Sequence, residues 1–292
     1  MENIRGIGLM VLAMAGFALA DMFIKSVSSH IPVGEILLFI GTGGTLFFAA
    51  MAGRNGEAVV SRDLFSGLIL LRTLGEMAGT FGFVTALVLI PISTASAILQ
   101  ATPLAVTLGA ALFMGEAVGW RRVSAIVVGF VGVLIIIRPG LEAFQPASLF
   151  AVLAVAGLSL RDLATRAAPR GFSTLRLGTY GFAALVPTGA VLLLLGEPLV
   201  LPDPGEWLFL ALALMFDMAG YHALTHAMRM GDVAIVTPFR YARLLFAIII
   251  GILVFGERLD LATIAGSLIV ILSGLYTFAR EHRQRLRSRP LP

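Results

Sequence analysis

Long apolar stretches dominate this chain and alternate with short polar breaks. A run of about 20 mainly apolar residues is long enough to cross the hydrocarbon core of a bilayer as a helix. The pattern predicts ten such helices, at residues 5–25, 33–52, 66–89, 92–114, 121–138, 147–167, 173–196, 205–229, 232–254 and 260–279. Glycine, proline and charged residues mark the breaks, as at 53–56, 138–140 and 231–232. No break is long enough for a soluble domain, so we expect an all-α integral membrane protein whose function resides in its helices.

The second half of the chain repeats the first at a spacing of 141 residues. The corresponding positions include Gly16 and Gly157, Asp21 and Asp162, Glu76 and Asp217, Gly79 and Gly220, and Glu116 and Glu257. The sequence therefore predicts two five-helix units, 1–141 and 142–279, followed by a basic cytoplasmic tail at 280–292. A unit with an odd number of spans enters the membrane from opposite sides in its two copies. Such inverted repeats are typical of transporters that work by alternating access.

Composition supports the membrane assignment and excludes several other classes of protein. Hydrophobic residues make up 58% of the chain and charged residues 13%, whereas soluble domains contain about 25% charged residues. The chain has no cysteine, which excludes disulfides and thiolate chemistry. Its pI is near 10.1, but the basic residues lie in short loops and the tail, so we expect no nucleic-acid partner. Residues 18–20 resemble a signal-peptide cleavage site, yet 16–21 recur at 157–162, which favours a retained first helix.

The distribution of basic residues predicts the orientation. With both termini in the cytoplasm, the outer segments contain only Lys25, Arg138 and Arg258. The cytoplasmic segments then contain 14 arginines: Arg5, Arg54, Arg62, Arg121, Arg122, Arg166, Arg170, Arg176, Arg229, Arg280, Arg283, Arg285, Arg287 and Arg289. Glu197, Asp203 and Glu206 add acidic residues to an outer loop. The positive-inside rule therefore predicts an N-in, C-in protein.

Two five-helix copies in which Gly-Glu closes the fourth helix resemble the EamA-type carriers of the drug/metabolite transporter superfamily. The matching stretches are 112–132 and 253–274, around Gly115-Glu116 and Gly256-Glu257. The chain is similar to the aromatic amino acid exporters of this family. The resemblance implies that helices 1–4 and 6–9 surround a central substrate cavity while helices 5 and 10 support it from outside. It also implies a multi-pass protein of the bacterial inner membrane.

Charged side chains within the spans are candidates for function, because burying charge in a membrane is costly. Arg72 and Glu76 lie in helix 3, Asp217 and His222 in helix 8, and Arg240 and Arg243 in helix 9. Subtracting 141 pairs Arg240 with Leu99, Arg243 with Thr102, and His222 with Phe81. The cytoplasmic pathway is thus charged where the outer pathway is apolar or hydroxylic, which predicts a cytoplasmic gate closed by arginine–carboxylate pairs.

Several of these charges have simpler structural interpretations. Arg72 and Glu76 are four residues apart and can neutralise each other. Arg240 and Arg243 can pair with Glu76 or Asp217, or bind a substrate carboxylate through their planar guanidinium groups. Near the helix ends, Asp21 with Lys25 and Asp162 with Arg166 are expected i, i+4 pairs, and Glu116 and Glu257 are expected to form turns. Coupling of transport to protons through Glu76, Asp217 or His222 is a further alternative.

Prolines and histidines raise two further alternatives. Pro103, Pro187 and Pro238 interrupt predicted helices, either as hinges or as static kinks. His222 and His226 have a spacing that permits metal binding, but no third ligand is adjacent and Arg229 disfavours a cation. We therefore expect no metal and no cofactor.

The sequence predicts a secondary transporter, not an enzyme, that moves small amphipathic metabolites outward, with aromatic or apolar amino acids as the favoured substrates. The alternatives are efflux of drugs or other metabolites and, less favoured, an intramembrane enzyme, for which no motif is found. The expected partners are this substrate and the lipid bilayer, and the protein is expected to be a monomer. The expected substrate-binding residues are Glu76, Gly79, Thr80, Phe81, Gln100, Thr102, Asp217, Tyr221, His222, Phe239, Arg240 and Tyr241. The expected gate residues are Arg72, Arg240, Arg243, Pro103 and Pro238.

Overall fold

The computed structural model describes residues 2–59, 66–116, 118–167, 173–196, 198–230 and 233–287. All regular structure within these ranges is helical, with no strand. The helices are α1 (Glu2–Val27), α2 (Val33–Arg54), α3 (Gly67–Leu89), α4 (Ile92–Leu99), α5 (Thr102–Phe113), α6 (Trp120–Ile137), α7 (Ser148–Ala167), α8 (Thr174–Leu194), α9 (Pro204–Met230), α10 (Val233–Val236), the 3₁₀ helix η2 (Thr237–Tyr241), α11 (Ala242–Leu253) and α12 (Leu261–Arg287). Nine spans in the described ranges are long and apolar enough to cross a membrane, with α4 and α5 counted as one span. The protein is therefore an all-helical, multi-pass membrane protein.

Two of the predicted spans are broken, at the places where Pro103 and Pro238 were expected to interrupt a helix. The predicted helix 92–114 stops at Gln100 and restarts at Thr102, and the predicted helix 232–254 consists of α10, η2 and α11. Each break includes a proline, Pro103 or Pro238, in the first turn of the following segment. Proline has no N–H to donate and its ring clashes with the carbonyl four residues earlier, so regular helix stops before it. In contrast, α8 continues through Pro187.

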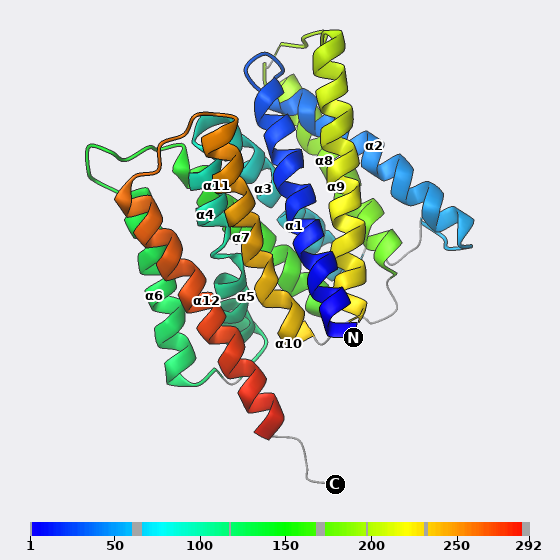
Figure 1. The fold of residues 1–292 in the computed structure, drawn as a ribbon. Coiled ribbons are helices and arrows are strands. Elements are labelled where there is room, and N and C mark those ends of the chain that lie inside the picture. The colour runs from blue at the N-terminus through cyan, green and yellow to red at the C-terminus, as the bar shows by residue number, and fades with distance from the viewer. Residues whose placement is uncertain are drawn as a thin grey trace.

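The helices associate in four main pairs: α1 with α9, α3 with α7, α2 with α8, and α6 with α12. Figure 1 shows α6 and α12 side by side at one edge of the bundle, away from α1, α2, α8 and α9. The start of α1 and the end of α12 lie at the same end, which we call the terminal end; the opposite end is the distal end (Figure 1). A shift of 141 residues converts α1 into α7 and α3 into α9, so it exchanges the α1–α9 pair with the α7–α3 pair.

Glycines allow these helices to approach backbone to backbone. A Cβ on Gly157 of α7 would lie 2.7 Å from the Cα of Gly79 on α3. At the corresponding positions, a Cβ on Gly16 of α1 would lie 3.3 Å from the Cα of Gly220 on α9. Small residues have this role in membrane proteins because apolar burial gives helices little drive to associate within lipid. The predicted substrate-binding residue Gly79 is therefore a packing position.

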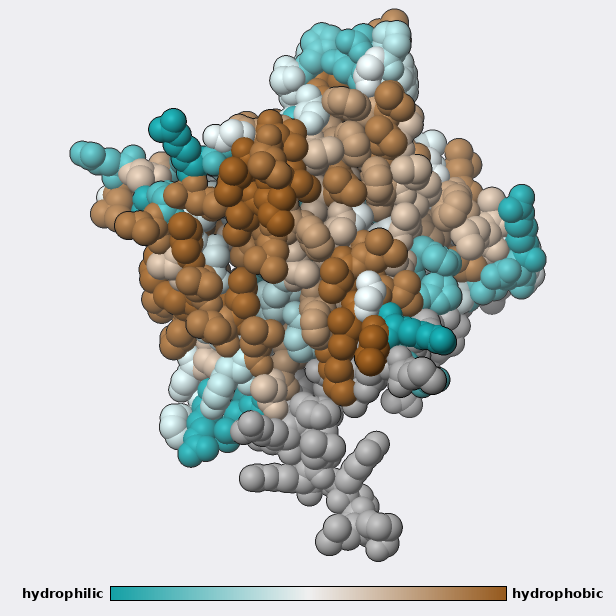
Figure 2. Space-filling model, in the orientation of Figure 1, coloured by the Kyte–Doolittle hydropathy of each residue, from teal (hydrophilic) through white to brown (hydrophobic). Residues whose placement is uncertain are grey.

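The surface between the two ends of the bundle is apolar. Figure 2 shows brown side chains over most of this face, with teal ones toward the ends. On α6 and α12 the exposed apolar side chains include Val127, Val131, Leu268 and Leu272. This distribution is expected of helices that face lipid.

At the distal end an ion pair joins α6 to the start of α12. Arg138, which ends α6 in the left-handed conformation, forms an ion pair with Asp260. The Asp260 carboxylate also accepts a hydrogen bond from the backbone N–H of Thr263, with an N–O distance of 2.7 Å. The bond from Arg138 lowers the pKa of Asp260 from its ordinary value of 3.8.

Some sequence-based assignments fall outside the described residues. They are the basic residues Arg62, Arg170 and Arg289, the acidic residue Glu197 and the break at 231–232. For Arg229 and for 281–287 of the predicted tail, the structure describes the backbone only.

The glycine contact between α3 and α7 gives a stability prediction. Gly157→Ala places a methyl group against the α3 backbone, and such overpacking costs about 1–3 kcal/mol. We expect a lower thermal unfolding midpoint for the purified variant. Gly8→Ala is the matched control, because a Cβ there meets nothing within 4 Å. Equal midpoints for the two variants would contradict the contact.

The Arg138–Asp260 pair gives a pH prediction. A carboxyl group whose pKa is lowered by folding adds stability above its unfolded pKa, and that contribution disappears as the pH falls through the folded pKa. We expect the unfolding midpoint to fall between about pH 5 and pH 3 less steeply in Asp260→Asn than in the parent. The effect is small because half of the Asp260 side chain is exposed. If the unfolding midpoints of the parent and Asp260→Asn fall in parallel as the pH is lowered, Asp260 does not contribute to the pH dependence of stability.

Candidate functional site

A cluster of charged side chains occupies the centre of the bundle. Asp21 of α1 is 4% exposed and forms a two-pronged ion pair with Arg243 of α11. Arg243 Nη2 lies 2.8 Å and its Nε 3.2 Å from Asp21 Oδ2. Rings of Phe17 and Phe83 lie 5.3 and 4.9 Å from the Arg243 guanidinium carbon, within cation–π range. The expected pair of Asp21 with Lys25 is therefore wrong, because Asp21 turns inward to a guanidinium that would otherwise be buried alone.

A second set of ion pairs surrounds Glu76 of α3. Arg161 Nη1 of α7 lies 3.1 Å from Glu76 Oε1, and Arg72 Nη2 lies 3.6 Å from Glu76 Oε2. Arg161 also binds Asp162, at 2.8 Å. The i, i+4 pair of Arg72 and Glu76 is thus confirmed. The expected pair of Asp162 with Arg166 is wrong, because Arg166 binds Glu116.

The sequence reasoning missed Arg161, the central partner of Glu76. A charged residue inside the apolar span 147–167 could have identified Arg161 as a candidate from the sequence. Arg161 has Ala20 as its counterpart in the first copy, so it adds to the charge asymmetry between the two halves. The arginine–carboxylate pairing expected at the centre is present, but with different partners from those predicted: Arg243 binds Asp21, and neither Glu76 nor Asp217.

Two charged groups of the cluster have no ion-pair partner among the described residues. Asp217 of α9 is half-buried and lies within electrostatic range of Asp21, Arg243 and Glu76. Arg240 of η2 is half-buried and lies within range of Asp162, Arg161 and Arg243. The arginines Arg72, Arg161 and Arg243, in contrast, are each bound by a carboxylate.

The breaks in the two discontinuous spans meet beside this cluster. Gln100, between α4 and α5, donates through Nε2 to the backbone carbonyls of Arg240 and Tyr241, at 3.4 and 3.3 Å. Thr102 Oγ1 donates to the Leu99 carbonyl at 2.7 Å. Backbone groups freed by a break within a membrane need such partners. Gln100 therefore links the two breaks and fixes the backbone that carries Arg240.

Aromatic side chains lie on the Glu76 side of the cluster. The ring of Tyr221 is 5.1 Å from that of Phe48 and 6.2 Å from that of Phe182. A Cβ on Gly181 of α8 would lie 3.3 Å from Glu76 Oε2. The predicted site residue Tyr221 is therefore next to the charges, together with two phenylalanines that the sequence did not single out.

Other predicted site residues lie elsewhere. Phe81 packs edge-on against Phe150 at 5.8 Å, in the α3–α7 contact, and Thr80 is half-buried on the same helix. His222 and Phe239 are exposed. The Tyr241 hydroxyl is directed at Gly274 of α12. The structure does not bring these side chains into the charged cluster.

No group of three or more potential metal ligands occurs among the described residues. The rings of His222 and His226 are 4.4 Å apart, on an exposed part of α9. Two imidazoles alone do not form a metal site of the usual kind.

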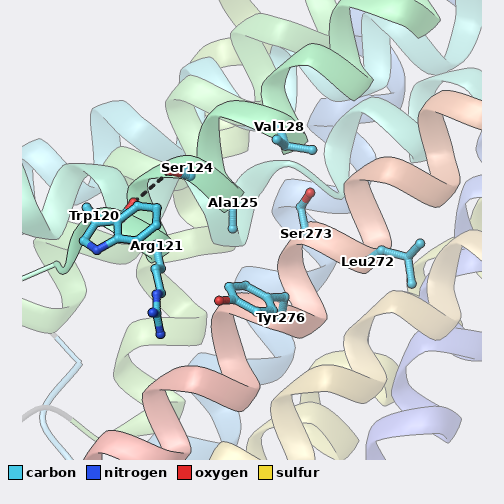
Figure 3. A pocket seen from close by; sticks show the side chains of 8 residues that line it. All are labelled: Trp120, Arg121, Ser124, Ala125, Val128, Leu272, Ser273 and Tyr276. Atoms are coloured by element: carbon cyan, nitrogen blue, oxygen red, sulfur yellow. Dashed lines mark hydrogen bonds between the residues drawn. The ribbon is translucent and has the colours of Figure 1, made fainter.

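Two hollows at the surface do not contact the charged cluster. The larger, of about 480 Å³, lies between α6 and α12. Figure 3 shows Ala125, Ser273 and Tyr276 facing one another across it, while Arg121 points away. The second, of about 220 Å³, lies at the distal end around Ser93, Arg138 and Asp260.

Comparison with known proteins identifies the family. The model of the EamA-like transporter family matches residues 4–138 and again residues 145–279. This chain belongs to the EamA-like transporter family. The resemblance seen in the sequence is thereby confirmed at the level of the family, and the protein is a membrane transporter.

Relatives of this EamA-family protein carry different substrates. The S-adenosylmethionine uptake transporter of Rickettsia conorii is 26% identical, over 96% of this chain and 94% of the relative. The pseudopaline exporter of Pseudomonas aeruginosa is 27% identical, over 92% and 94%. The riboflavin transporter of Brucella anthropi is 27% identical, over 78% and 81%. A crystal structure with 20% identity covers 93% of this chain and 98% of its own with a TM-score of 0.62, which supports the fold.

The Asp21–Arg243 pair gives a prediction for a double-mutant cycle. Asp21→Asn alone leaves a buried guanidinium without its counter-charge, which typically costs about 3–5 kcal/mol. Arg243→Met alone leaves the carboxylate unpaired. We expect the double variant to be more stable than the sum of the two single changes implies, measured by thermal unfolding of the purified protein. Additive effects would show that the two side chains are not coupled.

Proposed function

We propose that this EamA-family protein is a secondary carrier for small metabolites with an amino acid moiety, and that it works by alternating access in the bacterial inner membrane. The observation that carries the proposal is the pair of unmatched charges at the centre. Asp217 and Arg240 have no ion-pair partner among the described residues, whereas Glu76, Asp21, Arg161 and Arg243 are paired. One free carboxylate and one free guanidinium match the ammonium and carboxylate of a zwitterion.

Arg240 is the residue proposed to bind the substrate carboxylate. A guanidinium group presents a planar fork of donors that matches both oxygens of a carboxylate. Gln100 fixes the backbone of Arg240. The charges of Asp162 and Arg161 act on the Arg240 guanidinium, but neither residue forms an ion pair with it among the described residues. Asp217 is proposed to accept the ammonium group. S-adenosylmethionine, the substrate named for the Rickettsia relatives, is itself an amino acid derivative.

Three observations support an inverted repeat as the basis of alternating access. The family model matches two stretches whose starting points, residues 4 and 145, differ by 141. The glycine contacts of α1 with α9 and of α3 with α7 involve corresponding positions. Both copies break their fourth helix at the same point, Gln100 in the first and Tyr241 in the second. Discontinuous helices at the substrate site are common in transporters built from inverted repeats.

The proposed gate at the cytoplasmic side comprises Arg72, Arg243 and the backbone at Pro103 and Pro238. Arg72 is 4% exposed and bound to Glu76, so it is a structural partner and not a free ligand. The predicted N-in, C-in orientation places the terminal end in the cytoplasm. Export remains the predicted direction, and the relatives are named for uptake as well as export.

A second candidate substrate class is a neutral planar metabolite. The aromatic cluster of Phe48, Phe182 and Tyr221 beside Glu76 favours it, as aromatic faces stack on planar rings. The Brucella relative is named for riboflavin. The charge on Arg240 should matter little for such a substrate, which separates the two candidates.

The test is transport by the purified protein in liposomes, with labelled S-adenosylmethionine, a panel of aromatic and apolar amino acids, and riboflavin. We expect Arg240→Gln to raise KM for an amino acid substrate about tenfold, because a charge-assisted hydrogen bond contributes about 1.5–3 kcal/mol. Analogues that lack the carboxylate should show no difference between Arg240→Gln and the parent. His222→Gln, on the exposed part of α9, is the matched control.

Transport of riboflavin alone, unaffected by Arg240→Gln, would replace the amino acid assignment by the planar-metabolite candidate. Transport of an amino acid with an unchanged KM in Arg240→Gln would contradict the role of Arg240. Equal effects of Arg240→Gln and His222→Gln would do the same.

A further inference from the structure

The hollow between α6 and α12 lies on the terminal side of the point where these two helices touch. A Cβ on Gly132 of α6 would lie 2.9 Å from the Gly266 carbonyl oxygen of α12, and a Cβ on Gly266 would lie 2.6 Å from the Gly132 carbonyl oxygen. One turn nearer the terminal end, a Cβ on Gly129 would lie 3.2 Å from the Ser273 Cβ. Residues 120–128 of α6 contain no glycine. The close contact ends there, and a space of about 480 Å³ separates the helices.

The walls of this hollow are apolar, with aromatic rings nearest the terminal end. Ala125 and Val128 of α6 and Leu272 of α12 line it. Trp120, the first residue of α6, and Tyr276, one turn beyond Leu272, complete the lining and are exposed. Tryptophan and tyrosine are enriched at the level of the lipid headgroups, because their rings combine apolar faces with a polar atom. The hollow therefore extends from the headgroup level into the hydrocarbon region.

A buried hydroxyl group faces the hollow. Ser273 is 6% exposed, and its side chain faces Ala125 of α6 across the hollow (Figure 3). Its Oγ has no hydrogen-bond partner among the described residues, whereas Ser124 Oγ donates to the Trp120 carbonyl at 3.0 Å. A hydroxyl in an apolar environment costs free energy unless it is hydrogen-bonded. Ser273 therefore favours an occupant that carries an acceptor.

The rim of the hollow is positively charged. Arg121 is exposed, and its guanidinium carbon lies 5.3 Å from the ring of Trp120. The guanidinium points away from the hollow (Figure 3), as expected of a long side chain whose charge reaches the headgroup level. The N-cap of α6 is Gly119, which supplies no side-chain acceptor, so the helix dipole adds to the positive potential. The rim therefore attracts an anion, while the walls accommodate an acyl chain.

We propose that the hollow between α6 and α12 binds one phospholipid with an anionic headgroup. The headgroup lies beside Arg121 and the start of α6, and an ester carbonyl accepts a hydrogen bond from Ser273. One acyl chain occupies the space lined by Ala125, Val128 and Leu272. A single molecule of this kind accounts for the apolar walls, the buried hydroxyl and the basic rim together.

A second copy of the chain is the competing occupant, and the charges disfavour it. In a two-fold symmetric contact the same surface of both copies would meet. Two copies that span the membrane in the same orientation would place both Arg121 side chains and both α6 N-termini at the same depth, so that like charges would lie close together. An anionic lipid supplies the opposite charge instead.

Thermal unfolding of the delipidated protein in detergent, titrated with dioleoyl phosphatidylglycerol or dioleoyl phosphatidylcholine, tests the proposal. A ligand that binds only the folded protein raises the unfolding midpoint with its concentration. We expect the anionic lipid to act at lower concentration than the zwitterionic one. Arg121→Gln should raise the phosphatidylglycerol concentration for a half-maximal response about fivefold, the change expected for loss of one arginine at an anionic lipid surface. Arg5→Gln, an exposed arginine at the start of α1, is the matched control and should have no effect.

Two further variants test the hollow itself. Ala125→Phe fills the space between the helices and should weaken the response to both lipids. Ser273→Ala removes the hydroxyl donor and should weaken both responses by a smaller factor, because both lipids carry ester carbonyls. Native mass spectrometry of the same variants counts the phospholipids that stay bound, independently of the unfolding midpoint.

Equal responses of the parent to the two lipids would overturn the anionic selectivity, and equal effects of Arg121→Gln and Arg5→Gln would overturn the location. A dimer of the delipidated parent that Ala125→Phe converts to a monomer, measured by light scattering, would assign the hollow to a second copy. If Ala125→Phe does not fold, the comparison of Arg121→Gln with Arg5→Gln decides the question. The assay needs no substrate, so its outcome is independent of the transport assay.

Discussion

A polar group buried in hydrocarbon must find a partner within the protein, and this constraint organises the centre and both ends of the bundle. At the centre, Asp21 and Glu76 hold Arg243 and Arg161. At the breaks in the fourth spans, Gln100 donates to carbonyls that no helix can satisfy. At the distal end, Lys25 and Glu257 cap the two helix ends beside Ile90. Each partner comes from a distant part of the sequence, so the same bonds that satisfy the polar groups also position the helices.

The sequence predicted the helical class, most of the spans and the family, because these depend on local properties. Apolar length defines a span, and the 141-residue spacing of pairs such as Glu76 and Asp217 predicted the repeat. The interruptions at Gln100 and at 237–241 were not placed to the residue, although polar and charged side chains occur there, because hydropathy averaged over a whole span hides so short a break. Pro103 was noticed, but a proline permits either a kink or a new start. The choice depends on Gln100 contacting the other break, which is a tertiary contact.

Ion-pair partners were the least predictable part of the site. Charge and depth identified Glu76, Asp217, Arg240 and Arg243 as important, but sequence proximity suggested the wrong partners for Asp21 and Asp162. Residues one turn apart on a helix are only one of the available pairings. Asp21 binds Arg243 of another helix while the half-buried Lys25 donates to backbone carbonyls, and Asp162 binds its neighbour Arg161. Exposure cannot be read from sequence spacing either. His222 lies one residue from Tyr221, yet Tyr221 packs against Phe48 while His222 is exposed.

The failures of symmetry between the two halves carry the functional argument. Glu76 and Asp217 occupy corresponding positions, but Glu76 is bound by two arginines whereas Asp217 has no such partner among the described residues. Glu257 and Glu116 correspond as well, but Glu257 accepts from three donors of α4 while Glu116 binds Arg166. The difference at the centre is set by the sequence, since Arg240 and Arg161 correspond to Leu99 and Ala20 at the 141-residue spacing.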